Sequence, residues 1–346
     1  MAQDSPFEPN QVRVALIGGG TGSFTLLSAL KEHTSQLAAL VNMADDGGST
    51  GMLRDELGAL PPGDVRQCLV ALSRTPEMRD LFNYRFEDGS LKGHAFGNLF
   101  LTALEKMTGD FATGVRLAGE VLNIVGAVEP VTLSDVQLIM TDSEGDVTRG
   151  EFEIAHKRFN GERPALRLET VSGGSVVANP RALAAIDQAD IVVIAPGNLY
   201  GSLAPALVVP GIGEALRQTE AVTVYVCNLV TKPGQTDGFS VADFVDEIER
   251  FSGGPFLDAV LFNTEKPSAE LLRKYASEGE LSIEYNLDEL KTKPYTAVGT
   301  NLLSGSIWQN TNRSDPIASA RTLIRHDPQA TASAIMDLYD YFKGRS

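Results

Sequence analysis

The feature that most constrains the fold of this chain is a glycine-rich turn near its start. The turn, GGGTG at residues 18–22, follows an apolar run of Val12 and residues 14–17 and precedes a helical pattern at residues 24–30. Strand, glycine turn and helix in that order open a doubly wound α/β sheet, and the turn offers backbone N–H groups to a phosphate. Because it matches neither the P-loop nor the dinucleotide fingerprint, a tight turn without a ligand is the alternative. The predicted phosphate contacts are Gly19, Gly20, Thr21 and Gly22.

A second glycine turn, which contains two adjacent aspartates, follows the next apolar run, residues 37–41. Both turns should open on the carboxyl edge of a parallel sheet, where α/β proteins bind ligands. Adjacent carboxylates repel each other, so we predict either a Mg²⁺ ion held by Asp45 and Asp46 or hydrogen bonds to a ribose or base. In a third interpretation, one aspartate caps the helix that carries Leu53 and Leu57. The predicted ligand contacts here are Asp46, Gly47, Gly48 and Ser49.

Two further segments place polar side chains at helix starts. Asp64 is predicted to cap a helix that begins at Val65. Arg66 then lies in the first helical turn, where the helix dipole disfavours a cation, so a nearby anion explains it better. His94 and Asn98 lie around the start of another helix, and we predict that both contact the ligand. A histidine there would donate a hydrogen bond or act as a general acid, and a structural histidine is the alternative.

Two later apolar runs, residues 191–194 and 222–227, also end in polar turns. Parallel strands at these positions would bring both turns to the edge that carries the first glycine turn. Lys232 is a candidate phosphate ligand, with a solvated lysine as the alternative. The predicted ligand contacts from these turns are Gly197, Asn198, Leu199, Tyr200, Asn228 and Lys232.

The rest of the chain is predicted to complete one enlarged α/β domain. We expect a flexible tail over residues 1–11 and a single domain over 12–346, built on a Rossmann-like, doubly wound, mostly parallel sheet. Residues 124–178 are predicted to form an antiparallel β insertion with strands at 136–140, 150–155 and 165–171. A helix is predicted over 203–216, and residues 265–346 are predicted to form a helical closing segment.

The motifs GGGTG, ADDGGSTGMLRDELG, PPGDVRQCL, GHAFGNLF and PGNLYGS follow one another in an order that resembles the YvcK-type gluconeogenesis-factor family. That family lies in one superfamily with 2-phospho-L-lactate transferase, CofD. The resemblance implies a Rossmann-like core, binding of UDP-sugars such as UDP-N-acetylglucosamine, and a link to carbon metabolism, cell-wall synthesis and cell shape. The transferase branch implies a guanylylated phospholactate donor, Mg²⁺ and a homodimer.

Charge and hydropathy exclude several other classes of function. The chain has 29 basic and 45 acidic residues, a net charge of −16, which disfavours binding to nucleic acid or anionic lipid. No apolar run approaches the roughly 20 residues that span a membrane, and the N-terminal residues do not resemble a signal peptide. Cys68 and Cys227 are predicted to be buried thiols. We expect a cytoplasmic protein without a covalent cofactor.

Three functions fit these features. The first is a regulatory protein that binds a nucleotide-sugar. The second is a Mg²⁺-dependent transferase, in which an acceptor hydroxyl attacks phosphorus, a nucleoside monophosphate leaves, and Asp45, Asp46 and His94 act in catalysis. The third is an NAD(P) oxidoreductase, which the imperfect fingerprint disfavours.

Overall fold

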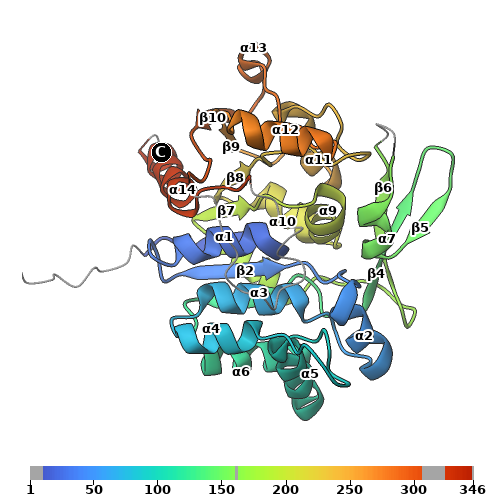
Figure 1. Cartoon of the computed structure of the whole chain (residues 1–346). Helices are drawn as coiled ribbons and strands as arrows, with labels where there is room; N and C mark the ends of the chain where they lie inside the picture. The colour runs from blue at the N-terminus through green and yellow to red at the C-terminus, as the bar shows by residue number, and fades with distance from the viewer. Residues whose placement is uncertain (1–10, 160–162, 306–323, 345–346) are drawn as a thin grey trace, which may run out of the picture.

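The main sheet of the molecule contains seven parallel strands in the order β10-β9-β8-β7-β1-β2-β3 (Figure 1). The computed structural model describes residues 11–159, 163–305 and 324–344, so the predicted tail, apart from Gln11, lies outside the described residues. The strands are β1 (Val14–Gly18), β2 (Leu37–Val41), β3 (Ala127–Pro130), β7 (Ile191–Ile194), β8 (Val222–Val226), β9 (Ala259–Asn263) and β10 (Thr296–Thr300).

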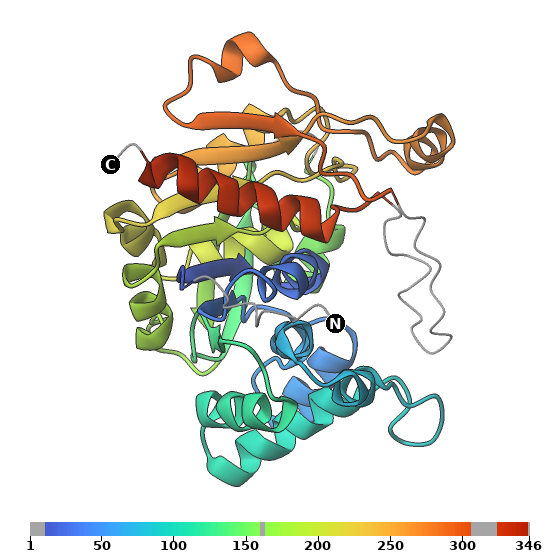
Figure 2. The ribbon, with the colours of Figure 1, turned by 90° about the vertical axis from the view of Figure 1, so that its left-hand side faces the viewer.

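The central strands read as continuous apolar runs because helices cover both faces of the sheet. Every residue of β1 and β7 is buried. Helix α1 (Gly20–Leu30) packs against both α3 (Gly63–Leu72) and α14 (Pro328–Lys343), and Figure 2 shows α14 along the same face as α1. The opposite face carries α8 (Pro180–Asp187), α10 (Ile212–Gln218) and α11 (Val241–Phe251). This arrangement confirms the predicted fold class.

The strand order reverses direction next to β1. From β1 the chain moves outward through β2 to β3, then returns to β7 on the other side of β1 and continues outward through β8, β9 and β10. In doubly wound sheets the crevice at such a switch point, outside the carboxyl ends of the strands, is where ligands bind. The glycine turn that follows β1 therefore lies at the place that this fold offers to a ligand.

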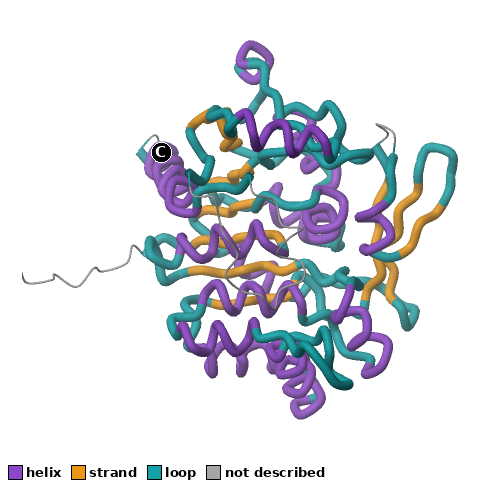
Figure 3. Tube along the Cα trace, in the orientation of Figure 1, coloured by secondary structure: helices purple, strands orange, loops and turns teal. Residues whose placement is uncertain are grey.

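The β insertion lies beside the carboxyl edge of the main sheet (Figure 3). It contains β4 (Val136–Thr141), β5 (Val147–Arg149) and β6 (Ala165–Thr170), paired antiparallel in the order β5-β4-β6. The predicted strand over 150–155 is wrong, because α7 (Glu151–His156) occupies it. Residues 124–178 also include β3, which pairs with β2 in the main sheet.

Two other predicted elements differ from the structure. The helix expected over 203–216 is broken into a π-helical turn (Leu199–Leu203), α9 (Ala204–Leu207) and α10, because Pro210 and Gly211, with φ of +96°, interrupt it. The closing segment is not wholly helical, since β10 forms the edge of the main sheet. The remaining helices are α2 (Gly48–Leu57), α4 (Pro76–Asn83), α5 (Phe96–Thr108), α6 (Phe111–Leu122), α12 (Ala269–Ser277) and α13 (Leu287–Leu290).

Cys68 and Cys227 are buried free thiols, as predicted. Over the described ranges, no single helix has the length and apolar character needed to cross a membrane. One bent pair, Leu199–Leu207 with Ile212–Gln218 at 73°, meets the criterion by length and composition alone.

Candidate functional site

The site forms around the glycine turn that joins β1 to α1. Gly20 adopts a φ of +63°, which favours glycine, and starts α1. Gly22 lies so close to the turn after β7 that a Cβ built there would overlap the Pro196 carbonyl oxygen. Two of the predicted turns therefore meet directly at the switch point. Gly22 is a packing position, whereas Thr21 is exposed at the start of the helix.

Asp64 fills the space that the missing side chain of Gly19 leaves. A Cβ on Gly19 would overlap the Asp64 Oδ2 atom, and the Gly20 N–H donates to the Asp64 carboxylate. The prediction that Asp64 caps its own helix is wrong, since α3 starts at Gly63 with Pro62 as the N-cap. Asp64 instead occupies the N-terminus of α1, where we predicted a phosphate. Burial, and next the charge of Asp45, raise the pKa of Asp64 to about 7.

The adjacent aspartates Asp45 and Asp46 have different surroundings. Asp45 accepts a hydrogen bond from the Gly47 N–H at 3.0 Å and another from the Thr50 hydroxyl, and burial raises its pKa. Its Oδ2 atom would lie 2.7 Å from a Cβ on Gly63. Asp45 therefore faces the start of α3, next to Asp64, and its charge raises the pKa of Asp64.

Asp46 caps a helix, but not the helix that we predicted. Its carboxylate accepts from the backbone N–H groups of Glu151 at 3.1 Å and Phe152 at 2.8 Å, the first residues of α7. The capping interpretation for α2 is wrong, because the Gly47 N-cap of α2 has no side-chain cap bond within the described ranges. Asp46 therefore anchors the β insertion to the site, and both of its oxygens accept backbone hydrogen bonds.

Glu151 is a member of the site that the sequence did not reveal. Its carboxylate lies against Gly201, where a Cβ would overlap Glu151 Oε1. Burial raises the pKa of Glu151 to about 8, followed by the charges of Asp45, Asp46 and Asp64, whereas Lys232 lowers it. The predicted strand over 150–155 gave no reason to bring residue 151 back to the glycine turns. The one available signal was Asp46, a carboxylate that required donors.

Lys232 lies close enough to Glu151 for their charges to interact, and burial lowers its pKa. We call Asp45, Asp64 and Glu151 the acid cluster. A different cation lowers the pKa of each: Arg54 that of Asp45, Arg66 that of Asp64 and half-buried Lys232 that of Glu151. Three acids with raised pKa values in one place are typical of functional sites, because folding alone does not favour them.

The turns after β7 and β8 are held by asparagines. Asn228 accepts from the Gly197 N–H at 3.3 Å and donates to the Gly197 carbonyl at 2.7 Å, and Asn198 accepts from the Gly201 N–H at 3.3 Å. Asn42, at the end of β2, donates to the Gly201 carbonyl at 3.3 Å. Asn228 and Asn198 therefore position the backbone of these turns.

Tyr200 and Leu199 face the protein interior. Tyr200 has no exposed surface, and its hydroxyl donates to Glu247 of α11 at 3.4 Å, while Leu199 is also buried. The π-helical turn directs both side chains into the core. No surface of the Tyr200 side chain remains for its predicted contact with a ligand, whereas the predicted ligand contact of Leu199 stays a prediction.

A buried hydrogen-bond network joins three other predicted residues. Arg66 donates from Nε to Asn98 Oδ1 at 3.0 Å, and Asn98 donates from Nδ2 to Ser49 Oγ at 3.3 Å. Arg66 also lowers the pKa of Asp64, so the network borders the acid cluster. His94 is buried, and its Nδ1 atom has no hydrogen-bond partner among the residues that the structure describes. Gly48, at the start of α2, is exposed.

The residues present fit a Mg²⁺ ion only in part. Within the described ranges, no three His, Cys, Asp or Glu side chains form a group that could hold a metal ion. Mg²⁺ in nucleotide sites commonly takes one or two carboxylates and completes its shell with phosphate oxygens and water. Asp45 lies close enough to Asp64 for its charge to raise the Asp64 pKa, and the two carboxylates could supply two such oxygens. Asp46 fits poorly, since the two N–H groups of α7 already engage it.

Fold and site together define a doubly wound α/β protein with a glycine turn and an acid cluster at its switch point. The family model "2-phospho-L-lactate transferase CofD" matches residues 14–303. The "Gluconeogenesis factor" of Bacillus subtilis is 37% identical over 94% of this chain and 98% of its own length. The protein of that name from Halalkalibacterium halodurans is 37% identical over 94% and 95%.

A crystal structure of a UPF0052-family protein from Bacillus halodurans matches with a TM-score of 0.83 and 35% identity, covering 94% of this chain and 99% of that one. The chain therefore belongs to the CofD family, in its YvcK-type gluconeogenesis-factor branch. This confirms the resemblance that the motifs indicated.

Proposed function

We propose that this chain binds a nucleotide-sugar of the UDP-N-acetylglucosamine type at the switch point and acts as a regulatory protein in carbon metabolism, cell-wall synthesis and cell shape. The observation that carries the proposal is the direct meeting of the β1–α1 glycine turn with the turn after β7. Backbone N–H groups at a helix start bind phosphates in this fold class. The name of the relatives, gluconeogenesis factor, supports a role in carbon metabolism.

Each part of the site has a task in this proposal. The start of α1 and Lys232 would hold the phosphates, while the turns that Asn198 and Asn228 position would contact the base and ribose. Asp64 now accepts from the Gly20 N–H, so an incoming phosphate requires that this carboxyl be protonated or neutralised by a cation. Its pKa of about 7 brings protonation within reach at neutral pH.

The acid cluster favours a second candidate, a Mg²⁺-dependent transferase. Mg²⁺ would neutralise phosphate charge, and Asp45 and Asp64 would hold it. Lys232 would hold phosphate oxygens. Glu151, with a pKa of about 8, would accept the proton of an acceptor hydroxyl. A cytoplasmic location, a homodimer and the ligand role of His94 stay predictions.

Thermal unfolding with added ligands separates the two functions. We expect UDP-N-acetylglucosamine without Mg²⁺ to stabilise the protein, by about 2.7 kcal/mol at 100 times its dissociation constant. Stabilisation by guanine nucleotides only with Mg²⁺ would favour the transferase, and stabilisation by NAD alone would contradict both. Lys232→Gln should weaken nucleotide-sugar binding at least tenfold. Lys291→Gln, a change at the exposed lysine that follows α13, is the matched control and should leave affinity unchanged.

A further inference from the structure

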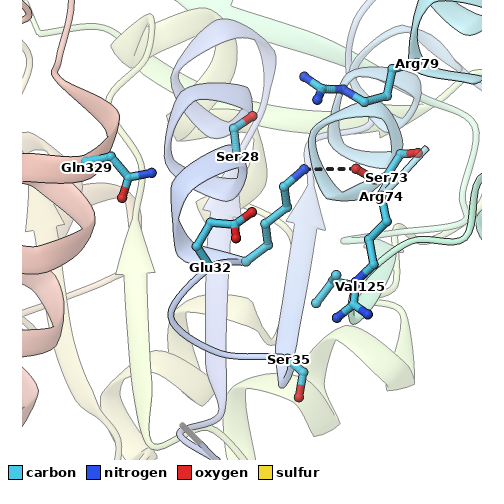
Figure 4. A pocket seen from close by; sticks show the side chains of 9 residues that line it. Ser28, Glu32, Ser35, Ser73, Arg74, Arg79, Val125 and Gln329 are labelled. Atoms are coloured by element: carbon cyan, nitrogen blue, oxygen red, sulfur yellow. Dashed lines mark hydrogen bonds between the residues drawn. The ribbon is translucent and has the colours of Figure 1, made fainter. Parts of the chain in front are cut away.

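A hollow lies at the opposite edge of the sheet from the switch point. It is a pocket of about 890 Å³, formed where α1 and α3 end and where β2 and β3 begin (Figure 4). These are the amino-terminal ends of the parallel strands, so the pocket is separate from the site described above. The residues that matter for its chemistry are Ser28, Lys31, Ser35, Ser73, Arg74 and Arg79.

The pocket gathers positive charge on a strongly acidic chain. Lys31, Arg74 and Arg79 line it, and Glu32 is its one acidic lining residue among the described residues. Burial lowers the pKa of Lys31, followed by the charge of Arg79, and Arg74 acts in the same direction. Since the chain carries a net charge of −16, three cations that repel one another in one hollow require an explanation beyond overall composition.

Helix capping explains part of this arrangement. Lys31 Nζ donates to the carbonyl oxygens of Ala71 at 2.8 Å and Ser73 at 2.9 Å, which lie at the C-terminal end of α3. A cation there satisfies helix-end carbonyls and interacts favourably with the helix dipole. An ammonium group has three N–H donors, so one donor of Lys31 remains for a ligand.

Capping does not explain the other donors of the pocket. The guanidinium groups of Arg74 and Arg79 make no hydrogen bond or ion pair with the part of the chain that the structure describes. The Ser28 hydroxyl is shielded from solvent and also has no partner within those ranges. Figure 4 shows the Arg79 guanidinium extending toward the side of α1 that carries Ser28.

We propose that this pocket, which we call the basic pocket, is a binding site for a phosphate group, either as free inorganic phosphate or on a small phosphorylated metabolite. The planar forks of two arginines bind phosphate oxygens in pairs, and Lys31 and Ser28 add single donors. The lining has one apolar side chain, Val125, and no aromatic ring within the described residues, so it suits a polar anion better than a base that stacks. A volume of this size accommodates a sugar phosphate.

Isothermal titration calorimetry at constant ionic strength tests the proposal, with inorganic phosphate and glucose 6-phosphate as probes. We expect saturable binding of at least one probe by the unaltered chain. The double variant Arg74→Gln/Arg79→Gln should raise its dissociation constant at least tenfold. Tighter binding of glucose 6-phosphate would identify a phosphorylated metabolite as the ligand class, and equal affinities would identify inorganic phosphate.

Two controls separate the basic pocket from the switch-point site and from general charge loss. The matched variant Arg116→Gln/Arg181→Gln removes two exposed arginines elsewhere and should change the dissociation constant less than twofold. Lys232→Gln alters the switch-point site and should also leave it unchanged. The proposal is overturned if neither probe binds saturably, if the Arg74→Gln/Arg79→Gln chain keeps its affinity while circular dichroism shows it folded, or if Lys232→Gln abolishes the binding.

Discussion

Replacement of Asp64 by asparagine should stabilise the ligand-free protein, and the gain should depend on pH. Asp64 lies against Gly19 beside Asp45, and burial is the main cause that raises its pKa to about 7. Asparagine has nearly the same shape and can still accept the hydrogen bond from the Gly20 N–H. The variant therefore removes the buried negative charge, which destabilises the fold, and keeps the hydrogen bond from the Gly20 N–H.

The magnitude follows from the two pKa values. A rise from 3.8 to about 7 corresponds to about 4 kcal/mol of folding free energy, because each pH unit is worth about 1.4 kcal/mol. The unfolded chain loses this proton above about pH 4 and the folded chain only above about pH 7. The cost of the charge therefore grows over that window and is constant above it. As upper values, we expect Asp64→Asn to gain about 2 kcal/mol at pH 5 and about 4 kcal/mol at pH 8.5.

Urea unfolding followed by circular dichroism at pH 5, 6, 7 and 8.5 measures this gain. Asp80→Asn, at an exposed aspartate in α4, is the matched control and should stay within about 0.5 kcal/mol of the parent chain at every pH. A gain for Asp64→Asn that is the same at pH 5 and pH 8.5 would refute the reasoning, because it would show that Asp64 does not hold its proton in the folded state.

Three more changes test other parts of the structure. Gly22→Ala should cost about 3 kcal/mol, because its methyl group meets the backbone of Pro196, and a loss under 1 kcal/mol in urea unfolding would contradict that contact. Asp46→Ala should cost about 1–2 kcal/mol and speed amide exchange in α7 before the main sheet, whereas unchanged exchange would remove its capping role. His326 is buried, its Nε2–H donates to the Cys227 carbonyl at 3.0 Å, and burial lowers its pKa to about 4. Because the folded chain resists protonation of His326, we expect the parent chain to lose about 2 kcal/mol of folding stability between pH 7 and pH 5. A His326→Gln chain that loses as much stability over this range would show that His326 is not the cause.

The sequence predicts the sheet well because its strands carry their own signal. The runs at 14–17 and 191–194 are wholly apolar and the run at 222–227 is mostly so, which predicts burial on both faces, and all three form strands of the parallel sheet. Residues 150–155 carry no such signal. Their helix depends on a carboxylate about a hundred positions earlier in the chain, and a local pattern cannot contain that information.

The candidate site was predictable at the level of turns but not of individual side chains. The parallel sheet places the turns after β1, β2, β7 and β8 at one edge, so their meeting follows from fold class alone. The directions of single side chains depend on local geometry that the residue types do not reveal. A π-helical turn sends Tyr200 into the core, and the space beside Gly19 admits Asp64 from another helix.

The electrostatics of the switch point constrain every function that is assigned to it. An anionic ligand brings negative charge to a place where burial already raises the pKa values of Asp45, Asp64 and Glu151, and where the charge of Asp45 raises those of the other two further. Arg54, Arg66 and Lys232 each offset part of this charge, yet burial keeps the pKa values of all three acids raised. A further negative charge therefore requires either a proton on a carboxyl or a bound cation. A regulator would balance the negative charge of its ligand by protonation of the carboxyls, and a transferase would balance it by binding Mg²⁺. Both functions must meet the excess of buried acids that the fold creates. Whether protons or Mg²⁺ meet it therefore separates a site that only binds its ligand from a site that converts it.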